Sequence, residues 1–239
     1  MRLESNRYTF LFAFAVCVTC SLALSIVSEG LKEKKDSNVA LDVKKNILKA
    51  VRLQTPLPAK AQANEVLDIY DMKIKEKVVD ARGQIVEGKR PDDIREGEAL
   101  YPMYVYKEGG WTVAYCFPIV GKGLWSTIYG YFALEADAIT VRGITFYRHG
   151  ETPGLGAEIE KNWFQDNYKG KKIWDVKGNT LVPIKVVKGK VEHVVPKAEA
   201  PFNVDGISGA TMTSKGVTAM VDRWVRVYEP FFKKIRKGK

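Results

Sequence analysis

Residues 205–214 read Asp205-Gly206-Ile207-Ser208-Gly209-Ala210-Thr211-Met212-Thr213-Ser214, a loop of small residues that carries two threonine hydroxyls. Beyond this loop, apolar residues recur at the spacing of one helical face: Val217, Met220, Val221, Trp224, Val225 and Tyr228. The pattern predicts an amphipathic helix that begins near the threonines. A helix start has unpaired backbone N–H groups and the positive end of the helix dipole, so it favours a phosphate group.

A simpler interpretation of the same residues stays open at this point. Serine and threonine are ordinary N-cap residues at helix starts, and glycine and alanine are common in loops. However, small side chains also leave the Thr211 oxygen accessible to a bulky protein. Glycine allows a positive φ angle or a close approach to a ligand. The residue types therefore suit both a structural and a ligand-binding role.

The order Asp-Gly-x-Ser-Gly-Ala-Thr resembles the flavinylation motif of proteins that carry FMN on a threonine through a phosphoester bond. The resemblance implies that a separate flavin transferase moves FMN from FAD onto Thr211, and that Thr213 is a neighbour that is not modified. Asp205 would hold a metal ion or orient the hydroxyl during this transfer, or it would only stabilise the turn. The cofactor site would also include the neighbouring residues Ser208, Gly209, Ala210 and Met212.

A second loop resembles the same family. Residues 149–158 read His149-Gly150-Glu151-Thr152-Pro153-Gly154-Leu155-Gly156-Ala157-Glu158, and their glycines and proline predict a rigid turn after a strand. In the family this loop contributes to the flavin pocket. The resemblance implies hydrogen-bonding groups at Glu151 and Thr152, an apolar surface at Leu155 and a close backbone approach at Gly156.

A third and weaker match is Gly121-Lys122-Gly123-Leu124-Trp125. Its tryptophan has two interpretations. Trp125 either stacks near the flavin or belongs to the hydrophobic core of the domain.

The N-terminal segment predicts a membrane anchor in residues 1–30. Residues 8–27 form a run of twenty uncharged residues, which as a helix spans about 30 Å, roughly the apolar thickness of a bilayer. A cleaved signal peptide is the alternative, but the run exceeds the usual apolar region of about 7–15 residues. Lysines and arginines flank both ends, so charge does not give the orientation. The family resemblance implies an inner-membrane anchor with the large domain on the periplasmic side.

The composition argues against several other functions. The chain has 239 residues and a net charge of +10, with much of the positive charge near residues 32–52 and in the tail 233–239. No nucleic-acid-binding module accompanies this charge, so we expect membrane lipid rather than nucleic acid as a partner. Cys17 and Cys20 lie within the apolar run and predict no metal site. No dinucleotide-binding fingerprint and no catalytic constellation is evident, and the two histidines are His149 and His193.

The rest of the pattern predicts an α+β fold: one transmembrane helix, then an FMN-binding domain with a twisted, mostly antiparallel sheet flanked by helices. Residues 31–72 are expected to be a helical stalk and linker, with helices at 41–53 and 61–70 and a linker at 55–58. Residues 73–239 are the expected FMN-binding domain, with a short helix at 161–168 and a hairpin turn at 188–190. The expected strands are 74–79, 101–106, 111–120, 126–134, 139–147, 181–188 and 191–195.

The segments Ala40-Leu41-Asp42 and Lys44-Lys45-Asn46-Ile47-Leu48 resemble the C subunits of sodium-translocating NADH:quinone oxidoreductases. This resemblance implies an electron relay. The FMN would accept electrons from a membrane iron–sulfur centre between two neighbouring subunits and pass them to the covalent FMN of the B subunit. The chain alone would not oxidise NADH. Two alternatives remain: the G subunit of an Rnf ferredoxin:NAD oxidoreductase, and a membrane-tethered flavin sensor or structural protein without catalysis.

Overall fold

The computed structural model describes residues 6–52 and 62–238 and divides the chain into two units, Met1–Val43 and Lys44–Lys239. The expected linker at 55–58 lies outside the described residues. The first unit is helical, and its helix α1 (Asn6–Ala50) continues into the second unit. The expected helix from residue 41 is therefore the last part of α1. A single glycine, Gly30, and no proline occur within α1, so nothing in the sequence ends the helix earlier.

The apolar part of α1 is long and hydrophobic enough to cross a membrane. An 18-residue window of the helix has a mean hydropathy of 2.5, and none of it is buried within the protein. By length and composition α1 therefore fits a single-pass anchor. An N-terminal signal sequence has the same properties, so the alternative noted from the sequence stands.

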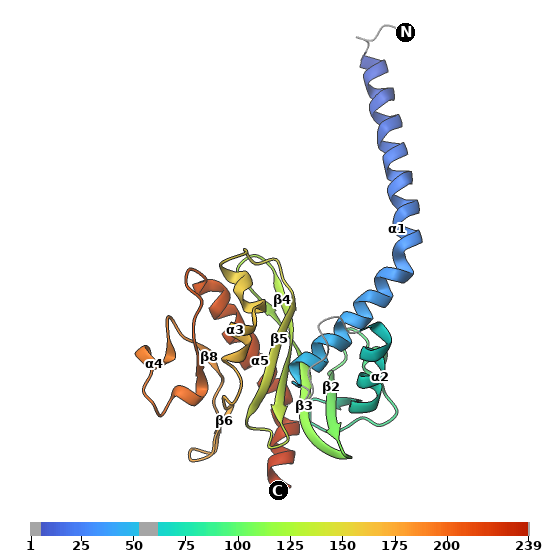
Figure 1. The fold of residues 1–239 in the computed structure, drawn as a ribbon. Helices are drawn as coiled ribbons and strands as arrows, with labels where there is room; N and C mark the ends of the chain where they lie inside the picture. Colours follow the sequence, from blue (N-terminus) through green and yellow to red (C-terminus); the bar gives the residue numbers. More distant parts are fainter. Residues whose placement is uncertain (1–5, 53–61, 239) are drawn as a thin grey trace. The chain divides into compact units, whose positions relative to one another are not determined.

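A five-stranded antiparallel sheet is the centre of the second unit, as the sequence predicted (Figure 1). Each strand pairs with the next one along the chain, in the order β1-β2-β3-β4-β5. Runs of β-branched and aromatic residues account for these strands. The strands are β1 (Ile74–Asp80), β2 (Leu100–Glu108), β3 (Trp111–Lys122), β4 (Thr127–Glu135) and β5 (Val141–Arg148).

The C-terminal helix α5 (Thr211–Lys237) covers one face of the sheet. Phe117 of β3 lies against Tyr228 of α5, with 4.3 Å between the ring centroids. The Trp224 indole donates a hydrogen bond of 2.7 Å to the Val120 carbonyl. The face predicted from helical spacing is buried or half-buried, so this prediction is confirmed. Because α5 is fixed along β3, its first turn lies at the end of β3 that leads into the β3–β4 loop.

The opposite face is covered by residues 44–50 of α1 and by α2 (Ala63–Lys73). Ile47 and Leu48 are fully buried, and the Thr145 hydroxyl of β5 donates to the Asn46 carbonyl. The Tyr70 hydroxyl of α2 donates a 2.9 Å hydrogen bond to Glu76 of β1. Helices on both faces bury the sheet and leave the loops at its ends for function.

The segment between β5 and α5 differs from the prediction. The expected strand 181–188 is two short pieces, and the expected strand 191–195 is a helical turn that the Asp205 carboxylate holds through the Val191 N–H. Residues 188–190 form no hairpin, because β8 pairs in parallel with β9 and not with its neighbour in sequence. The helix expected at 161–168 is confirmed as α3.

The short elements between β5 and α5 are η2 (Gly156–Glu160), α3 (Asn162–Asp166), β6 (Trp174–Asp175), β7 (Thr180–Leu181), β8 (Lys185–Val186), α4 (Val191–Val194), η3 (Ala200–Phe202) and β9 (Asn203–Val204). Another short element, η1 (Pro91–Asp93), precedes β2.

Candidate functional site

Three segments that are far apart in the sequence meet at the first turn of α5. They are the β3–β4 loop, the loop after β5 and the Thr211–Ser214 turn itself, and the Glu151 carboxylate joins them. Its Oε2 atom accepts hydrogen bonds from the Thr213 hydroxyl (2.6 Å) and the Leu124 N–H (3.1 Å). Its Oε1 atom accepts from the N–H groups of Trp125 (3.0 Å) and Ser126 (3.3 Å). All three segments resemble the flavin family, and one carboxylate connects them.

Two glycines allow this close arrangement. A Cβ atom on Gly123 would lie 2.5 Å from Glu151 Oε1. A Cβ atom on Gly156 would lie 2.6 Å from Thr213 Oγ1 and 2.9 Å from Glu151 Oε2. Real Cβ atoms do not approach oxygen this closely, so a side chain at either position would displace the carboxylate or the hydroxyl.

The Glu151 carboxyl group is kept ionised. It is only 5% exposed, and this burial by itself raises its pKa. The hydrogen bonds from Thr213 and from the backbone of residues 124–126 act in the opposite direction and hold its pKa below the ordinary value of 4.5. An ionised carboxylate accepts all four bonds at neutral pH.

This geometry predicts a pH-dependent stability. A lowered folded-state pKa means that ionised Glu151 stabilises the fold above pH 4.5 and that this contribution is lost as the pH falls through the lowered pKa. In Glu151→Gln the amide nitrogen cannot accept two of the four bonds, so we expect a loss of about 1–3 kcal/mol at neutral pH. Below the lowered pKa the two proteins should approach equal stability. Urea unfolding across a pH series measures the difference, and a difference that does not change with pH contradicts this prediction.

The two threonines occupy different environments. Thr213 is 1% exposed and bonded to Glu151, whereas Thr211 is exposed at the first position of α5. Ala210 is the N-cap residue, and it provides no side-chain cap for the described helix. The N-capping interpretation is therefore wrong here. The exposed Thr211 hydroxyl lies at the start of α5, where N–H groups have no partner within the helix, and such a position favours a phosphate group.

The two loops predicted from resemblance touch each other. Gly209 has a φ of +73°, and a Cβ atom there would lie 2.7 Å from the Leu155 side chain. The exposed Thr152 closes its own loop, because its carbonyl accepts the N–H groups of Leu155 and Ala157 at 3.1 and 3.0 Å. Ser208 is exposed beside Gly209. The sequence motifs at 151–156 and 208–213 thus form one surface.

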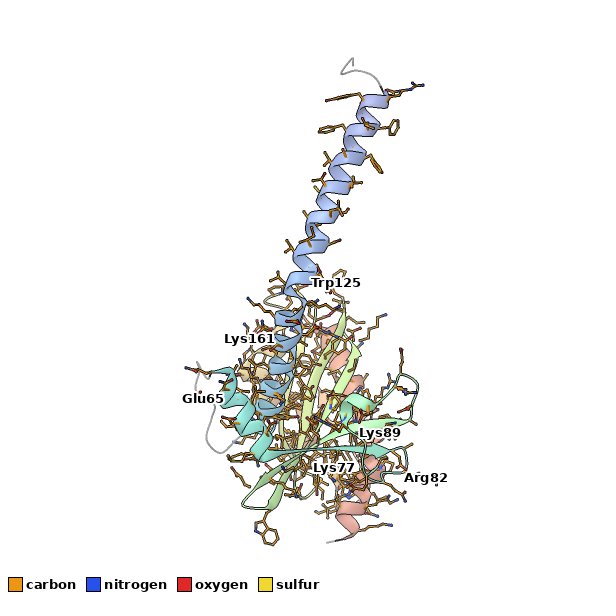
Figure 2. All side chains as sticks on the ribbon, turned by 90° about the vertical axis from the view of Figure 1, so that its right-hand side faces the viewer. Glu65, Lys77, Arg82, Lys89, Trp125 and Lys161 are labelled. Atoms are coloured by element: carbon orange, nitrogen blue, oxygen red, sulfur yellow. The ribbon has the colours of Figure 1, made fainter. Side chains whose placement is uncertain are left out.

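Exposed apolar side chains surround this surface. Trp125 is 72% exposed, so its assignment to the core is wrong. Leu124, Leu155 and Met212 are also exposed. Figure 2 shows Trp125 at one end of the second unit, with Lys77 and Arg82 toward the other end. Apolar and aromatic side chains with a few polar groups among them are the usual lining of cofactor sites.

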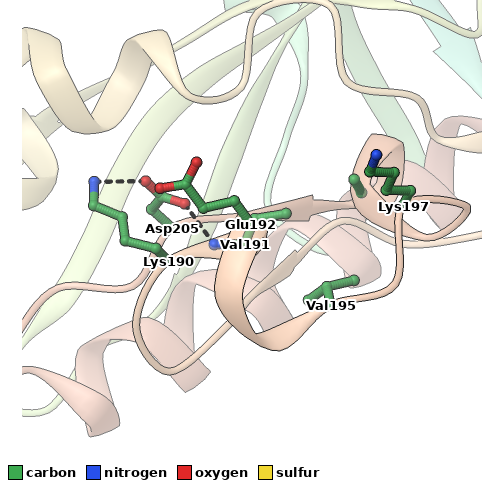
Figure 3. Close-up of a pocket in the computed structure, with 7 residues that line it drawn as sticks. Lys190, Val191, Glu192, Val195, Lys197 and Asp205 are labelled. Carbon is green, nitrogen blue, oxygen red and sulfur yellow. Dashed lines mark hydrogen bonds and ion pairs between the residues drawn. The ribbon is translucent and has the colours of Figure 1, made fainter.

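Asp205 has a structural partner. Its carboxylate accepts hydrogen bonds from the Lys190 ammonium (2.7 Å) and the Val191 N–H (2.9 Å). Burial raises its pKa, but these bonds lower it more, so the pKa lies below its usual value. It lines a pocket of about 390 Å³ with residues of the 190–200 segment (Figure 3). Among the described residues Asp205 belongs to no cluster of potential metal ligands.

Sequence reasoning missed two parts of the site. Leu124 and Ser126 donate backbone N–H groups to Glu151, and the Ser126 hydroxyl accepts the Gly150 N–H. The Glu151 N–H in turn donates to His149 Nδ1 at 3.2 Å. Backbone donors give no signal in side-chain chemistry. The only available hint was that Leu124 and Trp125 follow two glycines.

These residues fit an FMN group. The accessible Thr211 hydroxyl and the N–H groups of α5 suit its phosphate, and the exposed apolar side chains suit its ring system. Residues 123–226 match the family of FMN-binding domains, a segment that contains nearly the whole surface. The chain is 34% identical to the C subunit of the Na(+)-translocating NADH-quinone reductase of Yersinia pestis. The alignment covers 98% of this chain and 95% of that subunit. The chain belongs to the C-subunit family of this reductase.

Other members of the family agree. The C subunit from Pseudomonas aeruginosa is 32% identical over 98% of both chains. The crystal structure of the C subunit from Parabacteroides distasonis superposes with a TM-score of 0.72 at 32% identity, covering 84% of this chain and 96% of that one. Family membership confirms the resemblance to the C subunits, and with it a role in an oxidoreductase complex that binds FMN. By its length, apolar composition and place near the N-terminus, α1 fits a single-pass membrane anchor.

Proposed function

We propose that this protein relays electrons within a sodium-translocating NADH:quinone reductase through an FMN joined to the Thr211 oxygen by a phosphoester bond. The observation that carries the proposal is the contrast between the exposed Thr211 and the buried, hydrogen-bonded Thr213 at one helix start. Covalent FMN supplies one- and two-electron redox chemistry when bound. The chain's residues hold it in place.

Each part of the surface has a role in this proposal. The first N–H groups of α5 would hold the phosphate, and Leu124, Trp125, Leu155 and Met212 would cover the ring and exclude water. The exposed Thr152 and Ser208 provide polar groups at its edge. A tether to Thr211 keeps the flavin at an effective concentration of the order of mM or higher, so the cofactor is retained through every redox state.

We propose that residues 8–27 of α1 anchor the chain in the inner membrane and that the FMN-binding domain (73–239) lies on the periplasmic side. Its partners are membrane lipid, the flavin transferase that matures it, the proteins around a membrane iron–sulfur centre and the protein with the second covalent FMN. The sequence contains no Gly-x-Gly-x-x-Gly dinucleotide fingerprint, and we expect NADH turnover only in the complex.

Peptide mass spectrometry tests the attachment. The chain is co-expressed with the transferase and purified in detergent, and trypsin cleavage after Lys197 and Lys215 releases residues 198–215 with both threonines. We expect an FMN-sized mass increase on fragments that contain Thr211 but not Thr213. Proteins that co-purify should belong to an NADH-dependent complex. An unmodified peptide from the assembled complex contradicts the proposal, and a ferredoxin-dependent complex would favour the Rnf alternative.

A further inference from the structure

We propose that Glu151 directs flavin attachment to Thr211 by holding the hydroxyl of Thr213 in a buried hydrogen bond. The inference rests on the proposed function, because it concerns the choice between two hydroxyls for the same modification. It assigns Glu151 as a positioning residue that acts through Thr213.

The chemistry does not distinguish the two threonines. In the transfer, the threonine oxygen forms a bond to the phosphorus of the FMN half of FAD. The P–O anhydride bond breaks, and AMP leaves with the bridging oxygen and, in the overall balance, the hydroxyl proton. Either threonine oxygen can make this bond, and the two residues lie within one helical turn of each other. The way in which the fold presents each hydroxyl can therefore decide between them.

The fold separates the hydroxyls by direction. Residues two apart in an α-helix point about 200° apart around its axis. Thr211 consequently faces solvent while Thr213 faces the loop after β5, where it is 1% exposed. At 2.6 Å the Thr213 hydroxyl donates to a carboxylate, which makes a strong, charge-assisted hydrogen bond.

Glu151 is itself fixed, so it can hold the hydroxyl. Three backbone N–H groups of the β3–β4 loop bind the same carboxylate, and all are between 3.0 and 3.3 Å away. Gly123 and Gly156 have no side chains that would occupy the space of this carboxylate or of the Thr213 hydroxyl, so both groups can keep these positions. The Glu151 carboxylate thus determines both the orientation of Thr213 and the path of the loop that carries Trp125.

The test compares four chains that are co-expressed with the transferase and purified as above: wild type, Thr211→Ala, Thr211→Ala/Glu151→Ala and Thr211→Ala/Glu151→Gln. We expect FMN on Thr211 in the wild type and no adduct in Thr211→Ala. Both double variants should carry FMN on Thr213, because the hydrogen bond from Thr213 to the charged Glu151 is lost or weakened. The amount of FMN on Thr213 should be at least about tenfold above the background measured in Thr211→Ala. Circular dichroism and thermal unfolding confirm that the variants fold, and Glu151→Gln keeps the side-chain volume if Glu151→Ala does not fold.

Glu158 offers a matched control. Its carboxylate lies on the same segment but accepts the Trp163 indole N–H at 2.9 Å and does not bond Thr213. Thr211→Ala/Glu158→Ala should therefore carry no adduct, which separates the proposed role from a general loosening of the loop. FMN on Thr213 in Thr211→Ala alone, or its absence from the folded Glu151 double variants, overturns the inference. A wild-type chain without FMN on Thr211 is a different result, because it overturns the proposed function itself.

Discussion

Replacing Thr211 with alanine is expected to lower quinone reduction by the assembled complex by about a hundredfold or more at low free FMN. The variant loses the tether, and tethering typically strengthens retention of a ligand by about 10²–10⁴-fold. The exposed position of Thr211 means that its loss removes few packing contacts, so the fold and the assembly of the complex should persist. NADH-driven quinone reduction, measured beside the flavin content of the same preparation, checks the prediction.

Thr213→Ala is the matched control for this variant. Thr213→Ala removes the same two groups as Thr211→Ala, a methyl group and a hydroxyl, but it leaves the Thr211 oxygen at the helix start. We expect the flavin content to stay near that of the wild type, with a stability loss of about 1–2 kcal/mol from the lost bond to Glu151. If Thr211→Ala retained full turnover and Thr213→Ala lost it, the roles of the two threonines would be reversed.

Gly216→Ala is expected to destabilise the folded protein by about 1–3 kcal/mol, as overpacking does. Helix propensity alone predicts the opposite sign, because alanine is better than glycine inside a helix by about 1 kcal/mol. However, a Cβ atom at this position would lie 2.2 Å from the Lys122 carbonyl oxygen. The clash would push the first turn of α5 away from the end of β3, so FMN attachment should fall together with stability.

Thermal unfolding of the full chain in detergent measures this effect. Lys215→Ala, at the adjacent exposed position of the same helix turn, provides the control and should change stability by less than about 0.5 kcal/mol. A Gly216→Ala variant more stable than the wild type would show that α5 does not lie against the Lys122 carbonyl.

The helices and strands whose apolar residues follow a regular local pattern were predictable from the sequence. The apolar face of α5 and the β-branched and aromatic runs of β1 to β5 each favour one type of regular element, so the sequence predicts their conformation. The segment from residue 181 to 195 was not predictable in this way. Its valines have strand-like composition, but the Asp205 carboxylate and the parallel pairing of β8 with β9 decide its path. Both of these interactions come from residues that follow it in the chain.

The candidate site was predictable in part. The resemblance marked Thr211 and the 151–156 loop, and the fold brings these segments together. The connection itself was not visible, because Glu151 and Thr213 are 62 residues apart and the three other described donors to the Glu151 carboxylate are backbone N–H groups. Trp125 illustrates the same limit. Tryptophan is usually buried, and only the turn between β3 and β4 leaves it exposed.

The most direct measurement is a density map of the natively assembled complex at the first turn of α5. We expect continuous density from the Thr211 oxygen through a phosphate to a flavin ring that lies on Trp125 and Leu155, with Thr213 still bonded to Glu151. A Thr211 oxygen without attached density, in a complex that reduces quinone at its full rate, would contradict the proposed electron relay.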